Sequence, residues 1–260
     1  MPESVDEMID MAGAELKQLT RLLGLAGETA WDRLLEWLVD DYFRLDALGL
    51  ENIPAEGPAV IVANHSGAWG LDAFILHKVL TRSVRRPMFV PAAPLTFRVP
   101  VIGSYARKAG GFPVNPMLGL EHLNAGELVG VFPEGIAGLE KPFRERYRLR
   151  PFSPGFALTA LRSGAPVVPV SVIGAEEACP KIGEVPALAR FFDLPYFPLT
   201  PLFPLPAKWR ITVGEPIPAP EVPESFAARK AAARALCDEV QATVQAMVDR
   251  ERPLVEPVFG

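Results

Sequence analysis

Apolar residues recur at helical spacing near the beginning of the chain. Residues 6–41 predict helix in two pieces, which are separated near Gly24 and Gly27. In the second piece the apolar positions form one broad stripe, at Trp31, Leu34, Leu35, Leu38 and Tyr42. Such a stripe is typical of a helix that packs on a domain core. The alternative is an interfacial helix that places Trp31 and Trp37 in a bilayer surface.

From about residue 43 onward, short apolar runs alternate with helical stretches. Strands are predicted at residues 58–63, 88–90, 128–132, 167–174 and 208–214, and helices at 71–80, 116–126, 154–164 and 225–250. Pro169 favours an edge, a bulge or an end for its strand, because proline cannot donate a ladder hydrogen bond. The alternation predicts an α/β fold with a mixed, mostly parallel central sheet flanked by helices. We divide the chain into an N-terminal helical segment, residues 1–45, and one domain, residues 46–260.

One segment fits neither pattern. In residues 191–206 prolines interleave with Phe, Tyr and Leu, at Pro195, Pro198, Pro201, Pro204 and Pro206. Prolines at this density forbid a helix and remove ladder donors. The segment is predicted to be a packed surface loop or, alternatively, an apolar flap that touches a membrane or covers an acyl chain.

Composition excludes several classes of protein. The net charge is −5, whereas general nucleic-acid binders carry a basic excess, so we expect no nucleic-acid partner. Two cysteines and three histidines offer little for a disulfide framework or a metal site, and we expect no metal. The acidic first residues do not resemble a signal peptide, and no apolar run reaches the 18 residues or so that span a membrane. The motifs G-x-S-x-G, G-x-x-x-x-G-K-[ST] and G-x-G-x-x-G do not occur.

The sequence ANHSGAWGLDAF, residues 63–74, carries the clearest candidate chemistry. Its histidine, His65, follows a predicted buried strand, and ligands of α/β sheets bind at the carboxyl ends of strands. Asp72 falls in the first turn of the next helix, where it can fold back toward the loop. A histidine held by a carboxylate suits general-base catalysis, although a lone His–Asp pair is often structural.

A second block, VFPEGIAG at residues 131–138, also runs from a strand into a turn. Gly135 permits a positive φ and close approach of a ligand. Glu134 at a strand end is either a ligand-binding residue or a capping carboxylate in a tight turn. Backbone N–H groups near Gly135 or in loop 66–70 are candidates for an oxyanion site.

Basic residues gather directly after this block, at Lys141, Arg144, Arg146, Arg148 and Arg150. If this stretch is extended, its four arginines share one face, because side chains of a strand alternate. Such a row suits the phosphates of a nucleotide or lipid, or a solvated edge strand that is protected by charge. Lys108, before Gly110 and Gly111, is a further phosphate candidate.

The two blocks together resemble the lysophospholipid acyltransferase superfamily, which includes 1-acylglycerol-3-phosphate acyltransferases. The resemblance covers roughly residues 42–215, and four motifs carry it in the family's order: Asn64-His65 with Asp72, Gly110-Gly111-Phe112-Pro113, Phe132-Pro133-Glu134-Gly135 and Val168-Pro169-Val170. It implies that His65 and Asp72 are catalytic. It also implies that the substrates contact Asn64, Lys108, Phe132, Pro133, Glu134, Gly135, Arg144, Arg146 and Arg148.

Two departures from the family pattern bear on the acceptor. Six residues separate His65 from Asp72, where the family usually has four. The family commonly continues Pro-Glu-Gly with Thr-Arg, whereas this chain has Ile136 and Ala137. Because arginines that hold a glycerol phosphate are missing from their usual places, either Lys108 or the Arg144–Arg150 stretch replaces them or the acceptor lacks that phosphate.

The resemblance implies direct acyl transfer from acyl-CoA or acyl carrier protein to a lipid hydroxyl, with no cofactor. The acceptor is expected to be a lysophospholipid or related glycerolipid, or else a neutral alcohol such as diacylglycerol. A cytoplasmic protein attached peripherally to the inner face of a membrane is expected, because these substrates reside there. A non-catalytic lipid-binding protein and a thioesterase are the remaining hypotheses, and the sequence leaves the oligomeric state open.

Overall fold

The computed structural model describes the whole chain except residues 1–26, 28, 99–101, 192–195, 202 and 256–260. A central sheet contains β1 (Asp46–Leu48), β2 (Ala59–Ala63), β3 (Met88–Ala92), β4 (Gly111–Pro113), β5 (Leu128–Val131), β6 (Val167–Ile173) and β9 (Arg210–Val213). Their spatial order is β1-β9-β6-β2-β5-β3-β4. The run from β6 to β4 is parallel, whereas β9 is antiparallel to β6 and parallel to β1. The predicted mixed, mostly parallel α/β fold is therefore confirmed.

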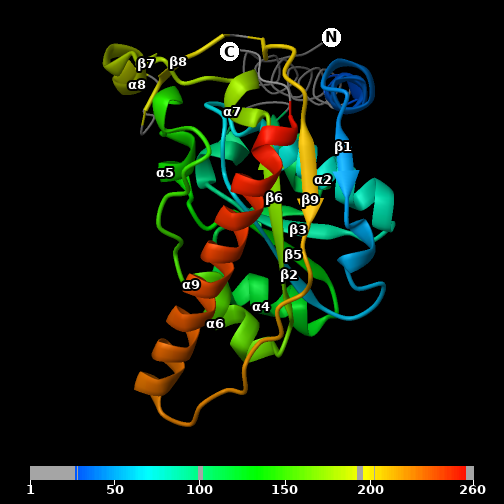
Figure 1. Ribbon diagram of the computed structural model, residues 1–260, viewed down its shortest axis with the longest axis vertical. Helices are drawn as coiled ribbons and strands as arrows, with labels where there is room; N and C mark the ends of the chain where they lie inside the picture. Colours follow the sequence, from blue (N-terminus) through cyan, green and yellow to red (C-terminus); the bar gives the residue numbers. More distant parts are fainter. Residues whose placement is uncertain (1–26, 28, 99–101, 192–195, 202, 256–260) are drawn as a thin grey trace, which may run out of the picture.

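Helices cover both faces of this sheet (Figure 1). The α-helices are α2 (Leu71–Val84), α3 (Ile102–Lys108), α4 (Pro116–Asn124), α5 (Ile136–Leu139), α6 (Gly155–Ser163), α7 (Ala175–Ala178), α8 (Pro186–Phe191) and α9 (Phe226–Glu251). Short 3₁₀ turns are η2 (Leu50–Asn52), η3 (Pro94–Arg98), η4 (Phe143–Glu145) and η5 (Arg252–Leu254). A separate small hairpin pairs β7 (Gly183–Glu184) with β8 (Pro198–Leu199).

The alternation of side chains along β2 divides the core into two parts. Ala59, Ile61 and Ala63 pack with α2, and Val60 and Val62 pack with α6 and α9 on the opposite face. All five residues are buried, which is why the run is uniformly apolar. Side chains cap two of the helices: Asn115 accepts from the Met117 N–H, and Ser225 accepts from the Ala228 N–H.

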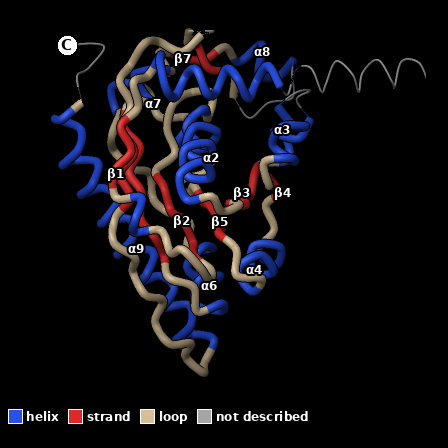
Figure 2. Tube along the Cα trace, turned by 90° about the vertical axis from the view of Figure 1, so that its right-hand side faces the viewer, coloured by secondary structure: helices blue, strands red, loops and turns tan. Residues whose placement is uncertain are grey.

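The described N-terminal residues pack against α2 (Figure 2). Residues 29–37 are helical and continue into the π-helical turn η1 (Leu38–Tyr42). Leu35 and Leu38 are buried, and Lys78 on α2 pairs with Asp32 at 2.8 Å and with Glu36 at 2.9 Å. The apolar stripe therefore faces the core, while Trp37 lies off it and is 43% exposed. Residues 1–26, the larger part of the predicted N-terminal segment, lie outside the described residues.

The strand that contains Pro169 lies in the interior of the sheet, between β2 and β9, and not at an edge. Pro169 sits where the ladder to β9 is interrupted, between the paired residues Val170↔Val213 and the isolated bridge Val167↔Ile217. Its carbonyl accepts from the Gly214 N–H at 2.8 Å. The missing N–H therefore falls at an irregularity of the sheet, where no regular ladder bond is lost.

Candidate active site

His65 lies just beyond the carboxyl end of β2. Asn64, which precedes it, is 2% exposed and pairs with the backbone of β6: its amide donates to the Val172 carbonyl at 2.9 Å and accepts from the Val172 N–H at 2.7 Å. Asn64 thus extends the β2–β6 pairing by one side chain. This anchoring engages the side-chain oxygen and one amide N–H of Asn64, and its contact with substrate stays a prediction.

Asp72 holds the His65 ring. His65 Nδ1 lies 2.9 Å from Asp72 Oδ2, and that oxygen also accepts from the Ser66 N–H at 2.6 Å. Asp72 is fully buried in the first turn of α2, whereas the His65 side chain remains 14% exposed. Because an ionised carboxylate only accepts, this geometry assigns the proton to Nδ1 and leaves the Nε2 lone pair available. The pair can act as an oriented general base.

Two glycines allow the six-residue connection to fold back. Gly67 and Gly70 have φ angles of +80° and +65°, and the Gly70 N–H donates to the Gly67 carbonyl at 3.0 Å. A Cβ on Gly67 would lie 2.7 Å from the Ala175 carbonyl oxygen. The loop is longer than the usual family spacing, yet this turn returns the Asp72 carboxylate to the histidine.

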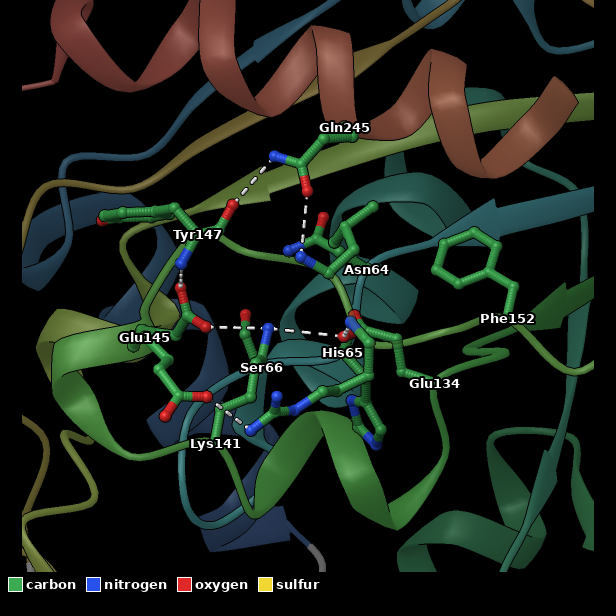
Figure 3. A network of polar contacts seen from close by, with 12 residues as sticks. Asn64, His65, Ser66, Glu134, Lys141, Glu145, Tyr147, Phe152 and Gln245 are labelled. Atoms are coloured by element: carbon green, nitrogen blue, oxygen red, sulfur yellow. Dashed lines mark hydrogen bonds and ion pairs between the residues drawn. The ribbon is translucent and has the colours of Figure 1, made fainter. Parts of the chain in front are cut away.

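Glu134 lies beside His65, and its side chain is buried (Figure 3). One carboxylate oxygen accepts from the His65 N–H at 2.8 Å, and the other accepts from the Arg150 N–H at 2.6 Å. Its side chain has no exposed surface. With both oxygens engaged by backbone donors, the carboxylate positions the backbone of His65, and a contact of Glu134 with substrate stays a prediction.

The other residues of the Phe-Pro-Glu-Gly block surround the histidine. The Phe132 ring lies 4.6 Å from the His65 ring, centroid to centroid, and Pro133 accepts from the Ser153 N–H at 3.0 Å through its carbonyl. Gly135 has φ +56° and ψ −144°, which is accessible essentially to glycine alone. Gly138 on α5 packs so closely that a Cβ there would lie 2.5 Å from the His65 carbonyl oxygen.

A buried ion network extends from Glu134. Lys141 Nζ lies 2.9 Å from a carboxylate oxygen of Glu176 and 3.4 Å from one of Glu134. Burial favours the neutral amine, but the two carboxylates outweigh it and raise the pKa of Lys141. Burial raises the pKa of Glu176, against the opposing effect of Lys141. No motif points to Glu176; the only sequence signal is an acidic residue shortly after a buried, mostly apolar strand.

The predicted row of arginines does not form. The stretch folds as the 3₁₀ turn η4 followed by a turn in which Tyr147 has φ +65°, so the alternation of a strand is lost. Arg150 pairs with Glu145 at 2.8 Å, and Arg146 lies over the Phe143 ring at 4.4 Å. Arg144 and Arg148 are exposed, and Lys108 ends α3 before the edge strand β4. Since β5 and β3 lie between β4 and β2, Lys108 belongs to a different part of the sheet from His65.

The backbone N–H groups proposed for an oxyanion site are largely engaged within the protein. Ser66 donates to Asp72, Ala68 to the Cys179 carbonyl, Gly70 to Gly67 and Gly135 to the Phe132 carbonyl. These four groups are therefore not available to a tetrahedral intermediate in this structure. Across the described part of the chain, His, Cys, Asp and Glu side chains nowhere gather in threes as a metal site requires.

Comparison with known proteins identifies the family. The family model described as Acyltransferase matches residues 44–173, half of the chain, and this stretch contains both halves of the site, His65–Asp72 and Glu134. The chain belongs to the acyltransferase family. Within the described residues, no helix of this acyltransferase-family member has the length and apolarity needed to cross a membrane.

Relatives and a solved structure agree with this membership. An uncharacterised protein of Mycobacterium tuberculosis is 42% identical over 224 residues, which are 82% of this chain and 63% of the relative. A chloroplastic 1-acyl-sn-glycerol-3-phosphate acyltransferase of Brassica napus is 30% identical over 150 residues, 54% of this chain and 40% of that protein. The crystal structure of the 1-acyl-sn-glycerophosphate acyltransferase PlsC of Thermotoga maritima aligns with a TM-score of 0.59 and 21% identity. The alignment covers 91% of this chain and 82% of the PlsC chain, and it shows a shared fold.

Proposed function

We propose that this protein transfers a fatty acyl chain from a thioester to the hydroxyl of a lysophospholipid or related glycerolipid. The observation that carries the proposal is the His65–Asp72 pair, with Nδ1 held at 2.9 Å and the ring partly exposed at the end of β2. Family membership supports acyl transfer as the reaction class. The matched part of the chain spans 63% of the length of the mycobacterial relatives. The proposal therefore concerns this chain and not those longer proteins.

The reaction needs one proton carrier. His65 Nε2 takes the proton of the acceptor hydroxyl as its oxygen attacks the thioester carbonyl carbon. The tetrahedral intermediate then collapses with cleavage of the carbon–sulfur bond, and the imidazolium returns the proton to the thiolate. Asp72 keeps Nδ1 protonated and stabilises the imidazolium. The products are an ester and the free thiol of coenzyme A or of acyl carrier protein, and no cofactor is required.

A covalent acyl-enzyme on cysteine is disfavoured. Cys179 lies close to the site, since its carbonyl accepts from the Ala68 N–H, but its thiol is buried. Burial, with Asp72 nearby, raises the pKa of Cys179 to about 12. A thiol with this pKa is a poor nucleophile near neutral pH. Direct transfer is therefore the simpler mechanism.

A neutral lipid alcohol such as diacylglycerol is a second candidate acceptor. Ile136 and Ala137 occupy the positions where the family commonly has Thr-Arg, and Ile136 is 43% exposed. Arg150 and Arg146 are engaged with Glu145 and Phe143. Ile136 and Ala137 therefore provide an apolar surface next to Gly135, which suits an acceptor without a phosphate.

The decisive experiment follows thiol release from long-chain acyl-CoA with a panel of acceptors: lysophosphatidate, lysophosphatidylcholine, monoacylglycerol, diacylglycerol and none. His65→Ala should lower turnover by about 10²–10⁴-fold. The matched control is His122→Gln, because His122 pairs with Glu127 and stacks on Phe89, away from His65. The preferred acceptor decides between the two candidates.

Other outcomes select other functions. Release without an acceptor would indicate a thioesterase, and equal turnover by wild type and His65→Ala would reject the mechanism. If acyl-CoA fails, acyl carrier protein is tested as the donor. Absence of turnover with either donor, together with lipid binding that does not depend on His65, would indicate a binding protein. We further propose a cytoplasmic protein attached peripherally to the inner face of a membrane, because its lipid substrates reside in a bilayer.

A further inference from the structure

We infer that one end of the molecule docks on a lipid bilayer through an apolar end surface formed by Trp37, Trp69, Ile182, Leu199 and Phe203. The inference rests on the proposed function, since it identifies where this lipid-modifying site meets its substrate. All five side chains are exposed: Trp37 and Trp69 by 43%, Leu199 and Phe203 by 49% and Ile182 by 68%. They come from four separate parts of the sequence.

Contacts join these side chains into one surface. Phe203 lies 6.4 Å from Trp37, between ring centroids, and 5.6 Å from Tyr42. Trp69 donates from its indole N–H to the Pro201 carbonyl at 3.4 Å, and the Leu199 carbonyl accepts from the Ile182 N–H at 3.0 Å. In Figure 1 the N-terminal helical residues and the β7–β8 hairpin lie at the same end of the molecule. Described residues of the proline-rich segment, Leu199, Pro201 and Phe203, thus contact all the other parts.

Many backbone polar groups of the proline-rich segment are either absent or hydrogen-bonded within the protein. Pro198, Pro201, Pro204 and Pro206 have no N–H to leave unsatisfied. Four carbonyls have partners within the protein: Phe197 with the Val185 N–H, Leu199 with Ile182, Pro201 with Trp69 and Pro204 with the Tyr42 hydroxyl at 2.8 Å. Each paired group lowers the desolvation cost of bringing the segment against a bilayer.

The scarcity of free backbone groups in the proline-rich segment favours a bilayer over a protein partner. A protein that pairs with a strand edge needs free N–H and carbonyl groups, which this segment largely lacks. Exposed Trp side chains such as Trp37 and Trp69 are typical of membrane-interface belts, and Phe203 adds apolar surface between them. Two acidic groups close to Trp37 are neutralised, because Glu36 pairs with Lys78 and Asp40 with Arg82, both at 2.9 Å. The surface is therefore mainly apolar, and it is suited to the headgroup–acyl boundary.

The same segment holds the catalytic loop. The Tyr196 hydroxyl donates to the Ala68 carbonyl at 3.0 Å. Trp69, the next residue of the loop, donates from its indole N–H to the Pro201 carbonyl. Gly70 follows directly, and a Cβ there would lie 3.7 Å from His65 Cε1. Docking of the apolar end surface would consequently bring the loop that carries His65 to the bilayer, where the acceptor hydroxyl and the acyl chain are found.

The test measures flotation with phosphatidylcholine vesicles and needs no turnover. In the Leu199→Ser/Phe203→Ser variant the partition coefficient should fall about tenfold or more, because two apolar side chains are removed from the contact. The matched control is Val222→Ser/Phe226→Ser. These residues are 49% and 79% exposed but lie around the start of α9, at the opposite end of the molecule. This control and His65→Ala should float like the wild type.

Three results would overturn the inference: Leu199→Ser/Phe203→Ser that floats like the wild type, a control that loses binding equally, or a wild type that ignores vesicles and instead dimerises through these residues in sedimentation. The wild type supplies a second readout, since brominated lipid should quench Trp37 and Trp69 but not Trp209, which is fully buried. Failure of acyl transfer with flotation intact would reject the proposed function alone. A wild type that turns over soluble substrates but does not float with vesicles would reject the docking surface alone.

Discussion

Glu134 Oε1 accepts a hydrogen bond of 2.8 Å from the backbone N–H of His65, a residue 69 positions earlier in the chain. The second oxygen of the same carboxylate accepts from the Arg150 N–H. The two motifs of the family pattern, Asn-His and Pro-Glu-Gly, are therefore joined by a hydrogen bond from a backbone N–H to a carboxylate. The imidazole ring of His65 is held separately, by Asp72.

Glu134→Gln should lower both stability and activity. Glutamine has only one acceptor oxygen, so its amide N–H₂ would face either the His65 or the Arg150 N–H. A buried donor left without an acceptor costs about 1–3 kcal/mol. Urea unfolding and kcat measure the two effects, and a variant that matches the wild type in both would show that the contact with His65 is dispensable.

Gly138→Ala should impair catalysis through crowding. The new Cβ would lie 2.5 Å from the His65 carbonyl oxygen and 2.9 Å from Glu134 Cβ, so the histidine backbone must move. Gly119→Ala is the matched control, because it lies on α4 with its nearest neighbour at 4.0 Å and should stabilise the helix by about 0.5–1 kcal/mol. We expect kcat to fall for Gly138→Ala only. Equal activity of both variants would contradict the close packing.

Asp72→Asn should reduce kcat by about 10²–10⁴-fold with little change in fold. An asparagine that offers its N–H₂ to Nδ1 favours the tautomer with the proton on Nε2, and that nitrogen can no longer act as the base. Steady-state kinetics with acyl-CoA measure the loss. Asp40→Asn is the control, because Asp40 pairs with Arg82 on the surface, where a change should leave turnover intact. Full activity of Asp72→Asn would remove Asp72 from the mechanism.

Neither cysteine should react with Ellman's reagent in the native protein. Burial raises the pKa of Cys179 to about 12, so at pH 8 only about 10⁻⁴ of the thiol is ionised. Burial also raises the pKa of Cys237. Both thiols should react after unfolding, and Cys179→Ala should retain acyl transfer. Rapid labelling of Cys179 that inactivates the enzyme would instead support a cysteine nucleophile.

Lys141→Met should cost about 3–5 kcal/mol in free energy of unfolding at pH 8, because Glu176 and Glu134 would remain buried without their cation. The pKa of Lys141 is raised above its ordinary 10.5 in the folded protein. Its stabilising contribution is therefore complete below pH 10.5 and is lost as the pH rises through the folded-state value.

Urea unfolding at pH 8 and pH 11.5 measures this dependence. The difference between wild type and Lys141→Met should be smaller at the higher pH. Lys208→Met serves as control, since Lys208 pairs with Asp46 on the surface, and exposed pairs contribute about 1 kcal/mol or less. An equal loss in the two variants would show that the buried network adds nothing.

The close agreement between the predicted and observed elements has a local cause. The apolar run of β2, the cap residues Asn115 and Ser225 and the alternation of strands with helices depend on neighbours in sequence. The position of His65 at a strand end and of Asp72 in the first helical turn is local in the same sense. For these features the pattern of residue types already contains the physical interaction.

The features that the sequence left open share the opposite property. An extended stretch would align the arginines, but Tyr147 donates its backbone N–H to Glu176, 29 residues away, and the chain turns there. The sequence left Pro169 at an edge, a bulge or a strand end, and β9 decides among them: it places the strand in the interior of the sheet, with Pro169 at an irregularity of the ladder. In each case a partner distant in sequence decides the conformation.

By itself, the sequence determined the class of fold, the strand ends that carry the candidate residues and the resemblance to the acyltransferases. Only the tertiary structure decided which way each side chain faces: Asn64 toward β6, Glu134 toward the backbone of His65 and Trp69 toward the proline-rich segment. The reason is that a hydrogen-bonding side chain turns toward whichever unpaired backbone group the fold brings near it. That choice depends on sheet order and register, which residue types along one strand do not specify.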